Sequence, residues 1–389
     1  MADLGGISIE TFRGDFAALE KMALASWREE YGAASFPNFY RPAFLHYLTD
    51  RIPDKRHLIA AYRGDEILGF LANLPQTFKY REKTHRAVYS CLLVARKEYL
   101  RRGLATAVIQ EALRVNENFK YDFSLLTLEK GHGSTKLMRK MAASGQPMHF
   151  VKKIRVIARI LDLARVNTSE GIKGWERAAI KIIGGARPPG PGRGQLLREY
   201  RPEDLDECLN LLNSYQERMT LALIWSRDSL SVELAYPDIS QTLVFERNGQ
   251  VEGLVNFIFH EHLGKAKERW AWVNHVAYPG LSSRERTDFV NAFLHYVQTA
   301  GCIGAVEWTR GYYPQGPFYR AHFFPYFRSV NMVSWSLNPE VVVRDIRTST
   351  RSRFNHLLIL RVRIAPGAET GAQATGVPAP SGLSSMTTG

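Results

Sequence analysis

The chain has 389 residues, of which 45% are hydrophobic, and its formal net charge at pH 7 is +13. This length allows two ordinary domains with separate cores, and no run of about 18 apolar residues could span a membrane. The first residues lack the basic start and apolar segment of a secretory signal, and three widely spaced cysteines predict reduced thiols rather than disulfides or a metal site. These features predict a cytoplasmic enzyme or binding protein without a metal.

The first half of the chain predicts alternating strands and helices. The turn 63–65, Arg-Gly-Asp, suits a tight hairpin, and residues 86–95 are nearly all apolar, as in a strand buried on both faces. In chain order, we expect a strand at 7–12, helices at 17–27 and 43–49, strands at 57–62, 66–74 and 86–95, a helix at 104–113, a strand at 121–128, a helix at 134–141 and a strand-rich run at 148–161.

The second half predicts the same order of elements. Asn248-Gly249 is a strong signal for a tight hairpin. The expected elements are a strand at 197–200, a helix at 202–219, strands at 241–247, 250–259 and 269–277, a helix at 289–300, a strand at 305–309, a short helix at 317–323 and strands at 329–337 and 356–364. The repeated order indicates an internal duplication, although few residues are identical between the halves.

We therefore predict an α/β (α+β) protein with two tandem domains, each a mixed sheet flanked by helices. The predicted divisions are an N-terminal domain at 1–166, a helix and Pro/Gly linker at 167–195, a C-terminal domain at 196–365 and a disordered tail at 366–389. Residues 1–165 carry 27 Lys and Arg against 17 Asp and Glu, whereas residues 196–345 carry 14 against 18. This polarity indicates a polyanionic ligand on the first half, although scattered surface Lys and Arg are the more common explanation.

The segment SCLLVARKEYLRRGLATAVIQEAL, which begins at Ser90, combines an apolar strand, a basic turn and an amphipathic helix. Free N–H groups and a positive dipole end at a helix N-terminus suit a phosphate. Gly103 and Ala105 would let the backbone approach a ligand, and Arg101 and Arg102 add positive charge. Gly103 could equally be a loop residue at an ordinary strand-to-helix connection, and the residues alone leave both interpretations open.

With these features in place, the chain resembles tandem members of the GCN5-related N-acetyltransferase (GNAT) superfamily, over about 7–165 and more loosely 196–340. The family's pyrophosphate loop is Arg/Gln-x-x-Gly-x-Gly/Ala; here LRRGLA matches at Gly103 and Ala105, with Leu100 at the Arg/Gln position. The resemblance implies an acyl-CoA co-substrate, most simply acetyl-CoA. Backbone groups would bind its pantetheine arm at Leu93, Val94 and Ala95 and its pyrophosphate at Arg101, Arg102, Gly103, Leu104, Ala105 and Thr106.

The second copy departs from this motif. Its corresponding turn, residues 277–283, lacks the Gly-x-Gly/Ala spacing, and Pro279 removes an N–H donor. Its segment GPFYRAHFF nevertheless resembles the family's late tyrosine element better than the first copy, where Met138 stands at the tyrosine position. The resemblance therefore implies one coenzyme site, in the first domain, with a degenerate loop in the second.

Acyl transfer to an amine needs a proton acceptor, an oxyanion stabiliser and a proton donor for the thiolate. We predict Glu129, at the end of the strand 121–128, or His132 in the next loop as the base, and Tyr319 as the acid. Each also has a simpler interpretation: a strand-end carboxylate, a solvated loop histidine and a core aromatic. The strand end at Val94 and Ala95 is the candidate oxyanion stabiliser.

Two other patterns carry less weight. His260-Glu261-His262 has the residue types of a metal site, but their i, i+2 spacing at a strand end, with no third ligand nearby in the sequence, is a weak signal. The end of a hairpin explains the pattern better. The aromatic residues between 312 and 327 predict either core or an acceptor pocket.

These observations predict an N-acetyltransferase that acts on a small-molecule or peptide amine. No membrane partner is expected, and an oligomer remains an open alternative. The first alternative function is a catalytically inactive tandem protein that binds or senses CoA. The second is a nucleic-acid binder, which the dispersed basic residues and the lack of a known binding motif make unlikely.

Overall fold

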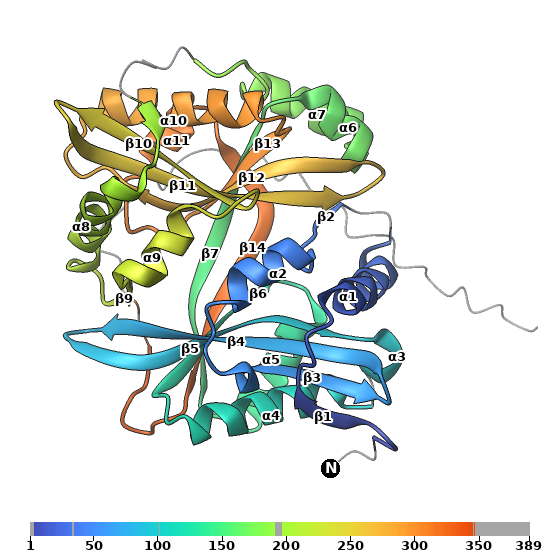
Figure 1. Ribbon diagram of the computed structural model, residues 1–389. Coiled ribbons are helices and arrows are strands. Elements are labelled where there is room, and N and C mark those ends of the chain that lie inside the picture. The colour runs from blue at the N-terminus through green and yellow to red at the C-terminus, as the bar shows by residue number, and fades with distance from the viewer. Residues whose placement is uncertain (1–3, 33–34, 101, 191–196, 345, 347–389) are drawn as a thin grey trace, which may run out of the picture.

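The computed structural model describes residues 4–32, 35–100, 102–190, 197–344 and 346 (Figure 1). The strand predicted at 356–364 and the tail predicted at 366–389 lie outside the described residues, as does Arg101. Among the described residues, no helix is both long and apolar enough to cross a membrane.

The first half forms a lobe built on strands β1, β3, β4, β5 and β6. Its elements are β1 (Ser8–Thr11), α1 (Phe16–Tyr31), β2 (Phe36–Pro37), α2 (Pro42–Thr49), β3 (Leu58–Arg63), β4 (Glu66–Tyr80), β5 (Lys83–Ala95), α3 (Lys97–Leu100), α4 (Leu104–Asn118), β6 (Phe123–Glu129), α5 (Gly133–Ala143) and β7 (Met148–Ile160). Every strand and helix predicted here is present, with bounds that differ by a few residues; β4 is longer than expected and α3 was not predicted.

The second half forms a lobe with the same order. Its elements are α6 (Leu163–Glu170), α7 (Gly174–Ile182), β8 (Leu197–Glu199), α8 (Leu205–Gln216), β9 (Leu221–Ile224), α9 (Arg227–Leu234), β10 (Ser240–Arg247), β11 (Gln250–Leu263), β12 (Lys267–Ala277), α10 (Ser283–Thr299), β13 (Gly304–Trp308), α11 (Gly316–Arg320) and β14 (Phe324–Ser336). The β10–β11 hairpin turns at Asn248 and Gly249, both with positive φ, which confirms the predicted tight turn. The helix predicted at 202–219 is shorter, because 202–204 form a 3-10 turn, and α6 and α9 were not predicted.

The described strands form one 14-stranded sheet that runs through both lobes. Along it, the order is β1-β3-β4-β5-β6-β14-β7-β13-β12-β11-β10-β8, with β2 paired to β11 and β9 to β4. The central connection is an exchange of strands: β6 of the first lobe pairs with β14 of the second half, and β13 pairs with β7 of the first half. Figure 1 shows β7 and β14 running side by side from one lobe to the other.

This exchange means that each lobe is completed by a strand from the other half of the chain. The predicted α/β (α+β) tandem fold is confirmed, with the sheets of the two lobes joined into one mixed sheet flanked by helices. The domain bounds at 166 and 196 stay a prediction, and strand pairing crosses this division. Two large cores fill the lobes, one around α8, α10 and β10–β13 and one around α4 and β3–β6.

Helix α4 is anchored to the sheet by a buried polar network. Asn73 on β4 donates to the side-chain oxygen of Asn116 at 2.9 Å and accepts from Ser90 on β5 at 2.6 Å. Since buried amides are stable only when their hydrogen bonds are made, this network fixes the helix relative to β5. The start of α4 is thereby fixed beside the end of that strand.

Candidate active site

A cavity of about 1120 Å³ lies between the lobes and is the candidate active site. Its walls come from α1, α2, β4, β5, β6, α5 and β7 of the first half and from α8, α9, β11, β12, β13 and β14 of the second. Figure 1 shows α2 between the two lobes, above β4 and β5.

The cavity reaches the point where two parallel strands separate. β5 and β6 pair only from Ala87 opposite Phe123 to Ser90 opposite Leu126. Beyond this point, Leu92 has a φ of 57° and the register of β5 against β4 shifts between Phe70 and Ala72. A bulge of this kind leaves a residue outside the ladder and redirects its backbone, so β5 can offer main-chain groups to a ligand in the opening.

Helix α4 begins next to this opening. Its N-cap residue, Gly103, has a φ of 83°, a left-handed conformation that costs glycine no steric strain. Ala105 and Thr106 line the cavity, and Leu104 is buried beneath them. The predicted phosphate-binding turn therefore lies at one end of the cavity, with free N–H groups of the first helical turn.

The structure brings together most residues proposed for the coenzyme. Leu93, Val94, Ala95, Ala105 and Thr106 all line the one cavity. Arg102 lies in the turn just before Gly103, with its guanidinium carbon 5.6 Å from the ring centroid of Tyr99. Sequence reasoning missed Leu92, whose positive φ has no signal in the residue type.

The two candidate bases also lie together in the cavity wall. Glu129 ends β6, and its Oε2 is 3.4 Å from Nε2 of His132. The hydroxyl of Thr135 donates to the carbonyl of Glu129 at 2.6 Å and holds the following loop. A carboxylate beside an imidazole can accept and relay a proton.

Tyr319 is not brought to this site. It lies on α11, 46% exposed, and is not part of the cavity wall. Met138, which occupies the tyrosine position of the first copy, is buried and lines the cavity. Other tyrosines do line it: Tyr40, Tyr47, Tyr89, Tyr215, Tyr312 and Tyr326.

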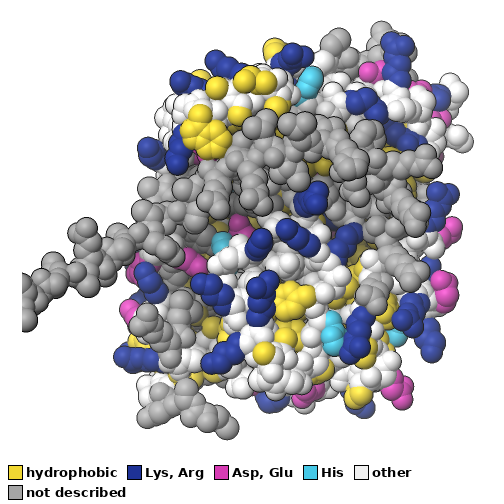
Figure 2. Space-filling view, turned by 180° about the vertical axis from the view of Figure 1, so that it is seen from behind, with side chains coloured by type: hydrophobic (Ala, Val, Ile, Leu, Met, Phe, Trp, Pro, Cys, Tyr) yellow, Lys and Arg dark blue, Asp and Glu magenta, His cyan; other side chains and the backbone are white. Residues whose placement is uncertain are grey.

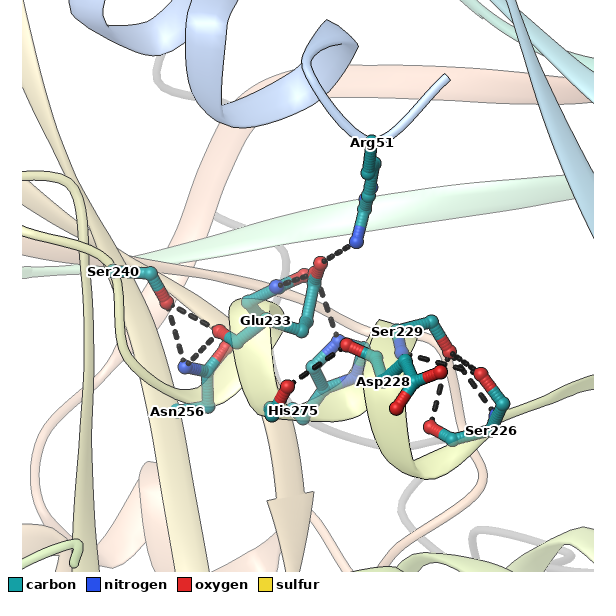
Figure 3. Close-up of polar contacts among 10 residues, drawn as sticks. Arg51, Ser226, Asp228, Ser229, Glu233, Ser240, Asn256 and His275 are labelled. Carbon is teal, nitrogen blue, oxygen red and sulfur yellow. Dashed lines mark hydrogen bonds and ion pairs between the residues drawn. The ribbon is translucent and has the colours of Figure 1, made fainter. Parts of the chain in front are cut away.

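A second polar cluster faces the cavity from the other lobe, centred on Glu233 of α9 (Figure 3). Its carboxylate accepts from Arg51 at 3.0 Å and from Asn274 at 2.7 Å, and lies 3.3 Å from Nε2 of His275. Burial alone would raise the pKa of Glu233, but the hydrogen bonds from His275 and Asn274 and the charge of Arg51 outweigh it and lower the pKa to about 2. Burial lowers the pKa of His275, so this imidazole is neutral at pH 7.

The cluster joins residues far apart in the chain, which is why sequence reasoning missed it. Arg51 follows α2, whereas Glu233 is 182 residues later. Neither residue belongs to a recognisable motif, and a pair of this separation has no periodic signature.

In the second lobe, the opening that corresponds to the coenzyme site is filled by side chains. β12 and β13 separate after Val273, and the register of β12 against β11 shifts there too. The backbone N–H of Val276 donates to the hydroxyl of Tyr312 at 3.1 Å, and the hydroxyl of Tyr278 donates to the carbonyl of Pro314 at 2.5 Å. The backbone N–H of Tyr278 likewise donates to the hydroxyl of Tyr215 at 3.4 Å. The main-chain N–H groups of Val276 and Tyr278 are thus already bonded to tyrosine hydroxyls.

The remaining sequence patterns have structural explanations. Nε2 of His262 accepts from Trp272 at 3.1 Å, Glu261 pairs with Arg41 and Lys267, and no group of three possible metal ligands occurs among the described residues. Of the aromatic cluster, Tyr312 and Tyr326 line the cavity, whereas Tyr313, Phe318 and Phe323 are buried in the core. Figure 2 shows Lys and Arg spread over one face, with few Asp and Glu among them.

This fold and this opening define the class of protein. Residues 16–142 match the model of the Acetyltransferase (GNAT) family. The chain is similar to the solved structure of Saccharomyces cerevisiae N-myristoyltransferase with bound myristoyl-CoA and inhibitors, with a TM-score of 0.69 and 16% identity over 86% of this chain and 80% of that one. A second structure of that enzyme, with bound myristoyl-CoA, gives a TM-score of 0.68 and 15% identity over 85% and 78%.

No curated protein matches the chain by sequence. The resemblance to the GNAT superfamily is nevertheless confirmed: residues 16–142 are a GNAT domain, and the chain has a tandem GNAT fold.

Proposed function

We propose that the chain is an acyl-CoA-dependent N-acyltransferase with one coenzyme site, in the first lobe. The observation that carries this proposal is the meeting of three features at one cavity: the bulge at Leu92, the separation of β5 from β6, and the helix start at Gly103. Together they offer backbone donors for a thioester oxygen and for a pyrophosphate. The GNAT domain and the N-myristoyltransferase fold support the same class of reaction.

In the proposed reaction, the amine attacks the thioester carbonyl directly. The new C–N bond forms, the C–S bond breaks, a proton leaves the nitrogen and a proton is added to the CoA sulfur. Val94 and Ala95, the oxyanion stabilisers predicted from the sequence, are paired with Phe70 and Gly69 of β4, so main-chain N–H groups at the bulge, Leu92 and Leu93, would take this role instead. The Glu129–His132 pair would take the proton from nitrogen. Cys91 also lines the cavity, but burial raises its pKa to about 12, so a thiolate that could carry the acyl group does not form at neutral pH.

The length of the acyl group that the protein transfers can be tested with two acyl-CoA donors. Acetyl-CoA is the donor implied by the sequence resemblance, whereas the cavity volume and an apolar wall that includes Leu74, Phe78 and Leu125 support a longer chain. Myristoyl-CoA, the ligand named for the similar structures, is the second donor. Release of free CoA thiol would be measured with each donor over a panel of amines.

Glu129→Gln with acceptor and donor at saturation tests the proposed base. We expect kcat to fall by roughly 10²–10⁴-fold, the usual contribution of general-base catalysis, while donor affinity is unchanged. Glu117→Gln, an exposed position on α4, is the matched control. An unchanged kcat in Glu129→Gln would remove Glu129 from the mechanism.

The alternative, a CoA-binding protein without catalysis, is favoured by one observation: Met138 lies where related enzymes have a tyrosine and leaves that part of the cavity wall apolar. Thermal stabilisation by both thioesters without CoA release over the amine panel would support this alternative.

A further inference from the structure

Two partly buried, positively charged side chains line the cavity without a carboxylate partner among the described residues. Lys152 of β7 donates from Nζ to the carbonyl oxygen of Arg310 at 2.7 Å, and Arg310 donates from Nη1 to the carbonyl oxygen of Asn274 at 2.6 Å. Among the described residues, neither forms an ion pair, in contrast to Arg51 in the same wall, which is paired with Glu233. These contacts are to neutral carbonyls, so both charges remain uncompensated.

Uncompensated charges are unusual in surroundings as buried and apolar as those of Lys152 and Arg310. Lys152 and Arg310 are both only partly exposed, and Trp308, Met332 and Tyr326 line the cavity with them. Burial lowers the pKa of Lys152, which shows that removing its charge from water has a cost. Glu307 is the nearby acidic group, but it is bonded to Tyr313 and Gln315, and burial raises its pKa to about 7. It therefore offsets the charge of Arg310 only in part.

The pair lies toward the interior of the cavity. The charge of Arg310 acts on Tyr89, which pairs with Leu125 in the joined part of β5 and β6, before the strands separate. The backbone groups proposed for the pyrophosphate, at 102–106, come after β5 has ended. The two cations are thus placed apart from the phosphate-binding turn, on the wall that an acceptor would contact.

On the basis of the proposed function, we infer that the acceptor is an amino acid, whose carboxylate binds between Lys152 and Arg310 while its amine faces the thioester. Lysine and arginine are the usual partners of a carboxylate, and charge-assisted hydrogen bonds are among the strongest in proteins. A carboxylate would neutralise the uncompensated charge of this wall, whereas an amide or a simple amine would leave it buried without a counter-ion. The aromatic wall at Trp272 and Trp308 offers an apolar surface for the side chain.

The test supplies the full-length protein with acyl-CoA and an equimolar mixture of the proteinogenic amino acids, or with the matching mixture of amino acid amides. Mass spectrometry then identifies acylated products. We expect roughly tenfold or greater preference for the acids, the size of one charge-assisted hydrogen bond. Lys152→Met and Arg310→Met should each remove this preference by lowering acylation of the acids, while the affinity for acyl-CoA stays unchanged.

Lys153→Met is the matched control, because Lys153 is the next residue of β7 and is exposed. Circular dichroism confirms that each variant is folded, and Lys152→Arg should retain the preference. Equal acylation of acids and amides would overturn the inference and leave the proposed function standing. A loss of acyl-CoA affinity in Lys152→Met would overturn it too, since the pair would then bind the coenzyme phosphates. No acylation of either mixture, with simple amines also inert, would overturn both proposals.

Discussion

Arg51 and Glu233 form an ion pair across the two lobes, with Nη1 of the arginine 3.0 Å from Oε2 of the glutamate. The arginine follows α2 and the glutamate is on α9, so the pair joins the two halves of the duplication at the cavity wall. The glutamate side chain is 8% exposed and that of the arginine 21%. Removing one partner would leave a buried charge.

Arg51→Met should therefore destabilise the protein by about 3 kcal/mol, the lower end of the range for breaking a buried ion pair. Chemical denaturation measures this free energy of unfolding. Arg56→Met is the control, because Arg56 is exposed and its ion-pair partner, Asp54, lies two residues earlier in the same turn. A loss as small in Arg51→Met as in Arg56→Met would show that the pair contributes little.

The same carboxylate predicts how stability depends on pH. The pKa of Glu233 is about 2 in the folded chain, below its ordinary value of 4.5. A lowered folded-state pKa means that the unfolded chain binds the proton more tightly, so the contribution is complete above about pH 5 and is lost as the pH falls toward 2. Thermal unfolding between pH 2 and 7 should show this loss, and Glu233→Gln should reduce the slope between pH 5 and 2. An unchanged slope would contradict the assignment.

The strand exchange predicts that the halves do not fold separately. Without β14, the first half would expose the edge of β6 from Phe123 to Glu129, and without β7 the second half would expose β13. Unpaired edges of this kind promote aggregation. Residues 1–166 expressed alone should be insoluble or unfolded, and co-expression with 167–389 should restore a soluble complex. A folded, monomeric fragment 1–166 would contradict this expectation.

The strands of this fold show which features can be predicted from the sequence: single elements can, but the pairing of β6, β7 and β14 cannot. The hairpin at Asn248-Gly249, the apolar strand that became β5 and the helical stripe of α4 are local signals, and each predicted its element correctly. The choice of β14 rather than β7 as the neighbour of β6 is not local, because both are 13-residue strands in which apolar and polar residues are mixed. Nothing in their residues says which pairs with which.

The site divides in the same way. The glycine of the proposed phosphate-binding turn, Gly103, was predictable because the motif needs it, and its φ of 83° agrees with that need. The sequence did not predict the bulge at Leu92 or the role of the cations Lys152 and Arg310. A leucine with positive φ and a lysine in a strand have no distinguishing signal in the sequence.

The filled opening of the second lobe predicts the stoichiometry of coenzyme binding. The hydroxyl of Tyr312 accepts the hydrogen bond of the Val276 N–H, and the carbonyl of Pro314, in the following loop, accepts from the hydroxyl of Tyr278. Calorimetric titration with CoA should therefore give one site per chain. Tyr312→Phe should leave this number at one and cost about 1 kcal/mol of stability, for one lost hydrogen bond. Two sites in the unaltered protein would show that the second lobe also binds the coenzyme.

Gly103→Glu tests the location of that one site. A glutamate side chain at the start of α4 would repel the pyrophosphate and occupy its space, so CoA binding should become undetectable by calorimetry, a loss of at least about 100-fold. Because any side chain is strained at this positive φ, Gly103→Ala is the matched control: it carries the same backbone strain, of about 1 kcal/mol, without the charge. We expect Gly103→Ala to bind CoA with an affinity lowered far less than in Gly103→Glu. If Gly103→Glu is folded and binds CoA as tightly as the unaltered chain, the coenzyme does not lie at this turn.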